Sequence, residues 1–391
     1  MVRRTLRVAV MLDLQWPYKR HADIFAGTQQ YAESQGWSSI IDEFLPDTLS
    51  ACTRSTVPYD GVIARANRAL ARQAARWKIP VVNVWASSPV RSALPGVFPD
   101  YAAAGRMCAE HLLARGFCYF AALTPRKNYG EELEVREFVR LVEEAGYRCL
   151  SENAPQSPWR DVAHWRKTER LVHRWMDRWQ TPIGVYISQE ALGRRVTQEC
   201  HQRGWRVPAD VAIISGQNQE TVCEHPRPSL TSMELGFEQV GYEAARLLGR
   251  LMGGQRPSCK PLVLPPLGLV VRESTDFFAV NDELVADALQ YIAAHSHRRI
   301  GPDDVARAVN AETRTLQNRF RRVLQRPIAT EIRRVRLERA KRELVHGDRR
   351  LSDIARDVGF GQAMRMYDVF RRELGVSPGA YRRQHQLQRP R

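Results

Sequence analysis

Long apolar runs are missing from this sequence. None of its 391 residues lies in a stretch that approaches the roughly 18 to 20 consecutive apolar residues of a membrane-spanning helix. The N-terminal segment also lacks a long apolar run that leads to a small-residue cleavage site, as a secretory signal has. We therefore expect a soluble, cytoplasmic protein that does not contact a membrane.

Cysteine is scarce and follows no pattern. The seven cysteines are odd in number, form no C-x-x-C pair and are absent from the last third of the chain. Neither a disulfide framework nor a zinc site of the usual spacing is therefore expected, and reduced thiols suit the cytoplasm. His295 and His297 have no third ligand nearby in the sequence, so we expect no metal.

Motifs of common enzyme classes are missing as well. The chain contains no G-x-S-x-G, H-E-x-x-H or G-x-x-x-x-G-K-[ST] motif. The Gly253-Gly254 pair follows an expected helix and not a strand, which does not suit a phosphate-binding loop. We expect no catalytic residue and no cofactor, and a sugar-modifying α/β enzyme remains the weaker alternative.

Positive charge is abundant and unevenly placed. The formal net charge is +16, and residues 281–391 hold 24 Lys and Arg against 14 Asp and Glu. The remaining residues hold 35 against 29. Most cations of the C-terminal part are arginines, which suit bidentate contacts to phosphate and guanine. A polyanion is therefore expected to dock there; a basic tail that only aids solubility is the alternative.

Up to about residue 271, short β-rich segments alternate with longer amphipathic ones, as in parallel sheets covered by helices. Strands are expected at 6–12, 39–44, 61–64, 80–84, 119–123, 183–187 and 211–215. Helices are expected between them at 23–34, 101–115, 131–145, 164–179, 190–203 and 237–252. This number of strands favours two lobes with a cleft between them.

The β pattern ends near Asp276. Residues 261–275 are expected to form a closing strand pair that its prolines confine to a sheet edge. Short helices are expected after it, at 282–296, 302–309, 313–324, 328–346, 351–358, 362–374 and 378–383. We therefore expect a two-lobed α/β domain over 1–276, a linker over 277–284 and an all-α domain over 285–391.

Two segments of the helical part share one plan. Residues 303–320 predict a short helix, a turn near Asn310 and a second helix that begins at Thr313. Residues 352–370 repeat the plan, with Gly359 in the turn, where a tight helix-turn-helix needs a positive φ. Two such units in one basic domain specifically indicate DNA binding.

The helical part resembles the AraC/XylS family of transcription regulators. The resemblance rests on Ile354-Ala-x-x-x-Gly359-Phe360, on Phe370-Arg-Arg-x-x-Gly375-x-x-Pro378-x-x-Tyr381-Arg382 and on the linking Arg336-Leu-Glu-Arg-Ala-Lys341. It implies that residues 313–321 and 361–371 are recognition helices that enter successive major grooves of double-stranded DNA. The linking helix, 328–345, would fix their separation.

Residues near the start of a recognition helix reach base edges, where arginine pairs with guanine and Gln or Asn pairs with adenine. The predicted DNA-binding set is Thr313, Arg314, Thr315, Gln317, Asn318, Arg321 and Arg322 in the first unit, and Gln362, Ala363, Arg365, Met366 and Arg371 in the second. Of these, Arg321, Arg322 and Arg371 are expected to meet phosphates. The second unit departs from the family at Arg365-Met366, where Tyr-Phe is usual, and at the acid Asp368.

The α/β part resembles the LacI/GalR-type ligand domain, a two-lobed periplasmic-binding-protein-like (type I) fold. The resemblance rests on Asp60-Gly61-Val62-Ile63, Asp100-Tyr-Ala-Ala-Ala-Gly105, Val207-Pro208-x-Asp210 and Leu230-Thr-Ser-Met233. Such a domain in front of an AraC-type tail is similar to the xylose-operon regulator family. The resemblance implies a regulator, and specifically an activator, of carbohydrate and pentose-related genes that forms a homodimer and contacts RNA polymerase.

The same resemblance implies a small-molecule effector, a sugar or a derivative, in the cleft between the lobes. The implied contact residues are Trp16, Tyr18, Lys19, Asp100, Glu134, Arg136, Glu190, Gln217 and Asn218. Glu134 stands where arginine is usual in the family, and Gln217 stands where aspartate is usual. An amide adds a donor and removes a charged acceptor, so a cationic or otherwise different polar ligand suits this set better than a plain pentose. Loss of ligand response is the other alternative.

Overall fold

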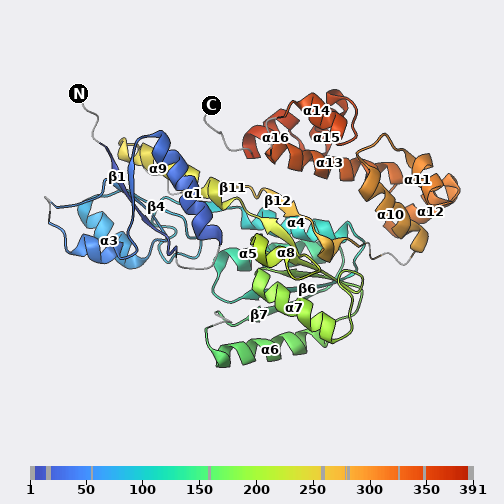
Figure 1. Ribbon diagram of the computed structural model, residues 1–391, viewed down its shortest axis with the longest axis horizontal. Helices are drawn as coiled ribbons and strands as arrows, with labels where there is room; N and C mark the ends of the chain where they lie inside the picture. The colour runs from blue at the N-terminus through green and yellow to red at the C-terminus, as the bar shows by residue number, and fades with distance from the viewer. Residues whose placement is uncertain are drawn as a thin grey trace.

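The computed structural model describes residues 5–14, 19–53, 56–156, 160–256, 260–277, 279, 282–324, 326–346 and 349–385. It confirms the expected fold class, with two α/β lobes followed by a helical C-terminal domain. In Figure 1 the N-terminal lobe is blue apart from the yellow helix near residue 245, most of the second lobe runs from cyan to yellow-green, and the helical domain is orange and red.

A four-stranded parallel sheet forms the centre of the N-terminal lobe. Its order is β2(Ser38–Ile41), β1(Arg7–Met11), β3(Gly61–Ala64) and β4(Val81–Asn83). A second pair, β5(Val97–Pro99) with β11(Leu262–Leu264), is attached to β4 through a bridge between Asn83 and Gly96. The helices of this lobe are α1(Lys19–Ser34), α2(Leu45–Ser50), α3(Arg68–Trp77) and α9(Phe237–Met252).

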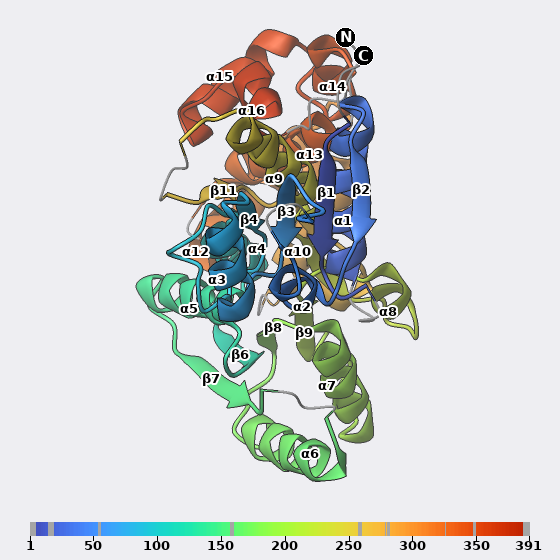
Figure 2. The same cartoon turned by 90° about the vertical axis from the view of Figure 1, so that its left-hand side faces the viewer.

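A six-stranded sheet forms the centre of the second lobe, which lies below the first in Figure 2. Its order is β12(Gly268–Val270), β10(Thr231–Glu234), β9(Val211–Ser215), β8(Ile183–Ile187), β6(Tyr119–Pro125) and β7(Cys149–Ala154). The helices of this lobe are α4(Tyr101–Leu113), α5(Tyr129–Glu144), α6(Val162–Met176), α7(Glu190–Gln202) and α8(Glu220–Glu224). Every residue of β8 and β9 is buried, as expected for central parallel strands covered on both faces.

The chain crosses between the lobes three times, after β5, after β10 and after β11. The crossings are hydrogen-bonded to one another: Asp100 N donates to the carbonyl oxygen of Leu264 (2.6 Å), and Leu267 N donates to that of Glu234 (2.9 Å). Three adjacent connections of this kind can act as a hinge, because rotation about them moves one lobe relative to the other.

Residues 261–275 do not form the expected strand pair, and that prediction is wrong. β11 pairs with β5 in the first lobe, whereas β12 pairs antiparallel with β10 in the second lobe. The two strands lie at sheet edges, but the Pro265-Pro266 step between them carries the chain from one lobe to the other.

The helical domain contains α10(Glu283–His295), α11(Pro302–Ala308), α12(Thr313–Leu324), α13(Ile328–His346), α14(Leu351–Asp357), α15(Ala363–Leu374) and α16(Pro378–His385). One apolar core is formed by α10, α11, α12 and the start of α13, and a second by the end of α13 with α14, α15 and α16. Within the expected linker 277–284, residues 278, 280 and 281 lie outside the described residues. None of the described helices is long and apolar enough to cross a membrane.

Candidate functional site

The first turn of α1 carries two cations from the N-terminal lobe toward the second lobe. Lys19 Nζ lies 3.1 Å from Glu234 Oε2 and 3.5 Å from the carbonyl oxygen of Asn218. Arg20 Nη1 lies 3.7 Å from Glu131 Oε1. Burial lowers the pKa of Lys19, but the Glu234 carboxylate outweighs this and leaves the pKa above its ordinary value. Opposite charges therefore join the lobes across the cleft.

Three buried glutamates face this cleft from the second lobe. Glu131 and Glu134 lie one turn apart on α5, and Glu190 begins α7; their exposed fractions are 1%, 0% and 5%. Burial raises the pKa of Glu131 and Glu190 to about 7, and it raises the pKa of Glu134 well above its ordinary value. The carboxylates are close enough that Glu131 and Glu190 both disfavour ionisation of Glu134. Three acidic groups are therefore gathered in a desolvated place, where ionisation of each is disfavoured.

Side-chain donors from two strand ends converge on Glu131. Gln217 Nε2 donates to Glu131 Oε1 at 2.9 Å, and Gln189 Nε2 donates to Oε2 at 3.0 Å. Ser188 Oγ lies 3.3 Å from the same Oε2. The amide at position 217 is thus a donor to an acid that comes from α5. The carboxylate expected at position 217 is absent, but the Glu131 carboxylate lies beside the Gln217 amide.

The other two glutamates accept fewer hydrogen bonds than Glu131 does. Glu190 Oε1 accepts a hydrogen bond from Gln219 N at 3.1 Å. Glu134 Oε2 accepts one from the Tyr186 hydroxyl at 2.6 Å, whereas Glu134 Oε1 is buried without a hydrogen-bond partner among the described residues. A buried carboxylate oxygen without a donor is costly, and a polar atom of this kind needs an explanation.

Gln217 and Asn218 follow β9 in the left-handed region, with φ of 66° and 46°. This backbone turn directs the two side chains to different partners. Asn218 Nδ2 donates to Glu234 Oε2 at 2.9 Å, and Asn218 Oδ1 accepts from Arg272 Nη2 at 2.8 Å. Strained backbone of this type at the carboxyl end of a central strand is typical of binding sites.

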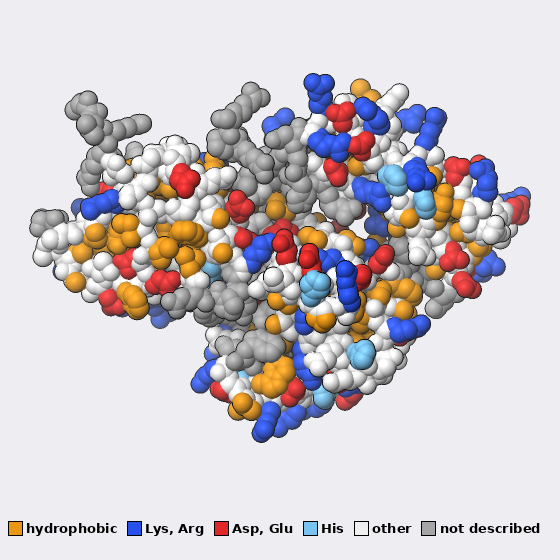
Figure 3. All heavy atoms as spheres, in the orientation of Figure 1, with side chains coloured by type: hydrophobic (Ala, Val, Ile, Leu, Met, Phe, Trp, Pro, Cys, Tyr) orange, Lys and Arg blue, Asp and Glu red, His pale blue; other side chains and the backbone are white. Residues whose placement is uncertain are grey.

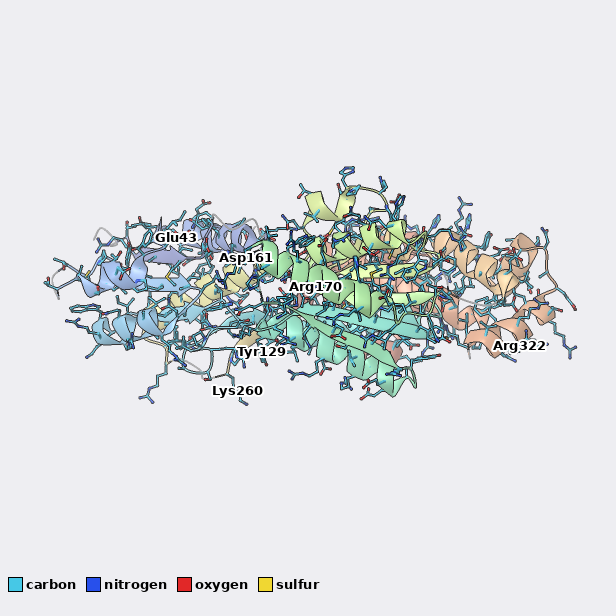
Figure 4. All side chains as sticks on the ribbon, turned by 90° about the horizontal axis from the view of Figure 1, so that it is seen from below. Glu43, Tyr129, Asp161, Arg170, Lys260 and Arg322 are labelled. Atoms are coloured by element: carbon cyan, nitrogen blue, oxygen red, sulfur yellow. The ribbon has the colours of Figure 1, made fainter. Side chains whose placement is uncertain are left out.

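The loop between β4 and β5 closes another side of the cleft. Ser87 Oγ accepts from Tyr129 N at 2.9 Å, and the Arg91 guanidinium lies 3.5 Å from the centroid of the Tyr129 ring. Figure 4 labels Tyr129 at the boundary of the two lobes. A cavity of about 30 Å³ remains nearby, lined by residues that include Arg20, Arg65, Trp85, Tyr101, Asn128 and Phe237. This closed arrangement has space for about one water molecule, so a larger ligand requires the lobes to open.

The structure brings several of the predicted ligand residues together. Lys19, Glu190, Gln217 and Asn218 take part in the contacts described above, and Glu134 lies beside them. Their ligand contacts remain predictions. Trp16 and Tyr18 lie outside the described residues.

Two predicted ligand residues have other surroundings. Asp100 lies at the hinge, where its Oδ1 caps α4 by accepting from Ala103 N at 2.8 Å. Arg136 is exposed and lines a groove on the outer side of α5, because two residues along a helix turn a side chain to the opposite face from Glu134. The prediction for Arg136 is therefore corrected: it does not face the cleft.

Three charged residues of the cleft were missed from the sequence: Arg20, Glu131 and Glu234. Glu131 precedes Glu134 by three residues, a spacing that places both on one helix face, so helical periodicity could have identified it. Arg20 and Glu234 carry no such signal, since their importance depends on the closed arrangement of the lobes.

The first helix-turn-helix unit is formed by α11 and α12. Asn310 supplies the turn with φ of 52°, and Phe320 anchors α12 in the core. The predicted base-reading residues lie on the outer face of α12: Arg314, Thr315 and Asn318 are exposed, and Gln317 is partly exposed. Thr313 Oγ1 donates to Asp303 Oδ1 at 2.8 Å, which ties the start of α12 to α11.

Arginines on the rest of α12 form a basic surface. Arg319 Nη1 and Arg322 Nη2 lie 3.3 and 3.7 Å from the Asp282 carboxylate, whereas the exposed Arg321 has no partner among the described residues. Arg322 lies toward the outer end of the helical domain in Figure 4. Lys and Arg side chains are prominent on this domain, at the upper right of Figure 3. Such a surface suits phosphate contacts.

The second unit is formed by α14 and α15, and one predicted reader in it is corrected. Met366 is fully buried, because Met366, Val369 and Phe370 form an apolar stripe at helical spacing that fills the core. It does not face DNA. Met364 and Tyr367, with exposed fractions of 68% and 39%, occupy the outer face and were missed from the sequence.

The other predicted residues of the second unit lie on or near its surface. Gln362 and Arg365 are exposed, Ala363 is half-buried, and Arg365 has no side-chain partner within the described ranges. The Arg371 guanidinium lies 5.7 Å from the centroid of the Tyr367 ring. Their DNA contacts remain predictions.

The two units are locked to one another at Gly359. This residue has φ of +94°, and a Cβ there would lie 2.2 Å from the carbonyl oxygen of Ser296 at the end of α10. Arg336 Nε donates to the same Ser296 oxygen at 2.8 Å. Glycine is therefore required both by backbone conformation and by close approach, and α13 holds the two recognition helices at one separation.

Comparison with known proteins gives consistent results for both parts. Residues 109–275 match a periplasmic binding protein-like domain, and residues 305–384 match a helix-turn-helix domain. The xylose operon regulatory protein of Haemophilus influenzae is 25% identical over 98% of this chain and 99% of its own length. That of Escherichia coli K12 is 26% identical over 96% of each chain.

Solved structures agree on the fold. A xylose-binding transcription activator superposes with a TM-score of 0.61 at 23% identity, over 99% of this chain and 100% of its own. A complex of the transcriptional regulator CelR with cellobiose superposes on 70% of this chain and 85% of its own, with a TM-score of 0.56 at 22% identity.

The molecule is therefore a DNA-binding transcription regulator in which a periplasmic-binding-like sensor domain precedes an AraC-type helix-turn-helix domain. Over its full length it is similar, at about 25% identity, to xylose operon regulatory proteins. Proteins of this class regulate transcription and are not enzymes, which removes the sugar-modifying enzyme considered from the sequence.

The buried glutamates determine how stability should depend on pH. Their folded-state pKa values, about 7 for Glu131 and Glu190, lie above the ordinary value, so protonation stabilises the fold and this contribution is lost as the pH rises through 7. We expect the free energy of unfolding to fall from about pH 5 to about pH 7 and to level off by about pH 8, with a fall steeper than in Glu190→Gln by up to ~1.4 kcal/mol per pH unit. Denaturant titrations across this range measure both slopes. Equal slopes would contradict the assignment.

Proposed function

We propose that this protein is an effector-responsive activator of carbohydrate genes, with pentose-related genes as the first candidates. The observation that carries the proposal is the fusion of a polar cleft between two hinged lobes to two helix-turn-helix units in one chain. The names of the full-length relatives, both xylose operon regulatory proteins, support a sugar-related role. The activator role is supported by the name of the similar solved structure.

Helix α4 is suited to transmit movement from the cleft to the DNA-binding domain. It begins at Asp100, on the first lobe crossing, and ends where Ala114 presents a carbonyl oxygen. Arg326, in the helical domain, donates to this oxygen from Nη2 at 3.0 Å. Ala279 N donates to the adjacent carbonyl oxygen of Arg115 at 2.8 Å. One helix thus reaches from the hinge to the domain that binds DNA.

Arg326 is itself fixed to α13. Its Nε lies 2.7 Å from Glu331 Oε2, and Arg334 Nη2 lies 2.6 Å from Glu331 Oε1. Burial raises the pKa of Glu331, but the two guanidiniums outweigh burial and leave the pKa below its ordinary value. Since α13 connects the two units, a tilt of α4 acts on the position of both recognition helices.

Several partners are proposed from the family resemblance. A homodimer would let lobe closure change the distance between two DNA-binding domains, and an activator would contact RNA polymerase. We place the boundary between sensor and DNA-binding domain in residues 277–284. On α12 we assign base reading to Arg314, Thr315, Gln317 and Asn318, and phosphate contact to Arg321 and Arg322.

Gel-shift titration tests the central proposal. The full chain is titrated against upstream DNA from its own genomic neighbourhood and against scrambled DNA of equal length. We expect binding that prefers the upstream DNA and weakens steeply as salt increases, because arginines displace counterions from phosphates. Equal affinity for both DNAs would overturn the proposal.

A pair of substitutions on α12 separates base reading from phosphate contact. Arg314→Ala should weaken binding by ~1 to 3 kcal/mol and relax preference at one base position. Arg322→Ala should weaken binding to all sequences alike and reduce the salt slope by about one. Competition assays with a library of single-base operator variants measure both. If the two variants had the same sequence profile, the assignment of roles would be wrong.

The contact between α4 and Arg326 can be tested without an effector. Arg326→Ala should increase amide hydrogen exchange in the last turn of α4 and in the first turn of α13 by about threefold or more, since it removes the hydrogen bond between the domains. Arg333→Ala, an exposed position on α13 whose guanidinium contacts Thr330 of the same helix, is the matched control and should leave the last turn of α4 unchanged. Unchanged exchange in Arg326→Ala would contradict a coupling role for this contact.

A further inference from the structure

The cleft carries more negative than positive charge on its second-lobe side. Glu131, Glu134 and Glu190 are nearly fully buried there, and Glu234 lies at the hinge. The Arg20 guanidinium is close enough to act on the pKa of all three buried glutamates, and it lowers each of them. The positive charge of one guanidinium therefore acts on three glutamate side chains.

The distance between Arg20 and Glu131 shows that this charge compensation does not include a short hydrogen bond. Arg20 Nη1 is 3.7 Å from Glu131 Oε1, longer than a charge-assisted hydrogen bond of ~2.7 to 2.9 Å. By contrast, Lys19 Nζ lies 3.1 Å from Glu234 Oε2. The ammonium of Lys19 shows that a primary amine can be held by carboxylate and carbonyl oxygens at this end of the cleft.

The unpartnered oxygen of Glu134 shows that a hydrogen-bond donor is missing from the cleft. Glu134 is fully buried, its Oε2 is bonded to the Tyr186 hydroxyl, and its Oε1 has no partner among the described residues. Tyr101, which lines the remaining cavity, is close enough that Glu134 and Glu131 both raise the pKa of its hydroxyl, although burial is the main cause. The Tyr101 ring packs against α5, since a Cβ at Gly130 would lie 2.6 Å from this ring, so the helix that carries Glu131 and Glu134 borders the cavity. A cationic donor there would satisfy this oxygen and would favour the ionised form of Glu134, which burial disfavours.

Other ligand classes fit this set poorly. An acidic sugar would add a negative charge beside three desolvated acids, and a neutral sugar would supply no positive charge to favour their ionisation. Within the described part of the chain, no group of three or more His, Cys, Asp or Glu residues is arranged to hold a metal ion. A ligand with a protonated nitrogen fits this set, since it supplies both positive charge and hydrogen-bond donors.

We propose that the effector is a polyhydroxylated molecule of sugar size that carries a protonated amine, with the amine held by Glu131, Glu134 and Glu190. This inference rests on the proposed function, in which a ligand binds between the lobes. When the lobes open, the amine takes the place of Arg20 beside Glu131. The amine also supplies the hydrogen-bond donor that Glu134 Oε1 lacks. Gln217 and Gln189 keep Glu131 oriented, and Trp85 offers an aromatic face at the cavity wall.

A matched ligand series tests the inference on the full chain. Isothermal titration compares glucosamine with glucose, N-acetylglucosamine and glucuronate, and compares xylose with a xylose-derived amine. Removal of one hydrogen bond to a charged group costs about tenfold or more in affinity, so each amine should bind at least about tenfold more tightly than its neutral partner. Equal or tighter binding of the neutral or acidic members would overturn the proposal.

Substitutions locate the amine. Glu134→Gln and Glu190→Gln should each reduce the preference for the amine over its neutral partner by about tenfold. Glu132→Gln is the matched control, because Glu132 lies on the same helix and accepts from Lys127 N outside the cleft. Retention of the full preference in both cleft variants would place the amine elsewhere and contradict the assignment. The ligand series on the unmodified chain gives its result even if a variant folds poorly.

The gel-shift titration on the same preparation separates the two proposals. If the chain prefers its upstream DNA but shows no preference for amines, the amine inference fails and the proposed function stands. If it binds no DNA selectively, the proposed function fails whatever the ligand series shows.

Discussion

Burial of carboxylates between the lobes is the constraint on which the rest of the structure depends. Glu131, Glu134 and Glu190 are almost inaccessible to water, and ionised carboxylates in such surroundings need a nearby positive charge. That charge comes from Arg20, which belongs to the other lobe. Arg20 thus favours ionisation of the three glutamates from across the boundary between the lobes, so charge compensation depends on how the lobes are arranged. A ligand that compensates the same charge can change the balance between open and closed states.

The helix that carries two of these carboxylates is also in direct contact with the helix that reaches the DNA-binding domain. A Cβ at Gly105, on α4, would lie 2.0 Å from the carbonyl oxygen of Glu134 on α5. Such an approach leaves no room for the helices to slide independently. The contacts continue from α5 to α4, and from Ala114 at the end of α4 to Arg326 and α13. The charge state of the cleft and the orientation of the recognition helices are thus connected by packed contacts.

Much of the fold could be predicted from the sequence because its signals are local. Apolar strands and amphipathic helices alternate along the chain, and the turn residues Asn310 and Gly359 take the positive φ values that the helix-turn-helix pattern requires. The strand pair at 261–275 could not be predicted correctly, since which sheet a short strand joins depends on the arrangement of the lobes. Met366 was assigned to the DNA-facing surface from its position in the helix, although its spacing to Val369 and Phe370 indicates the core.

The candidate cleft was less predictable, for a physical reason. The amide at Gln217 was recognised as a departure, but its meaning depends on Glu131, which approaches it from a helix 86 residues earlier in the chain. Arg20 and Glu234 become functional candidates only when the lobes close and bring them to their partners. A sequence alone gives the inventory of charges, whereas the compensation between them is a property of the folded, closed molecule.

The two DNA-binding units differ in their electrostatics, and Asp282 is responsible for part of the difference. This carboxylate caps α10 directly after the interdomain segment, and it pairs with Arg319 and Arg322 of the first recognition helix. Phosphate contact by these arginines must compete with Asp282, whose side chain is only 7% exposed and is costly to leave unpaired. Asp282 therefore links the first recognition helix to the segment that leaves the sensor. The second unit carries the exposed acid Asp368 on its outer face, and this charge opposes the approach of phosphate to α15.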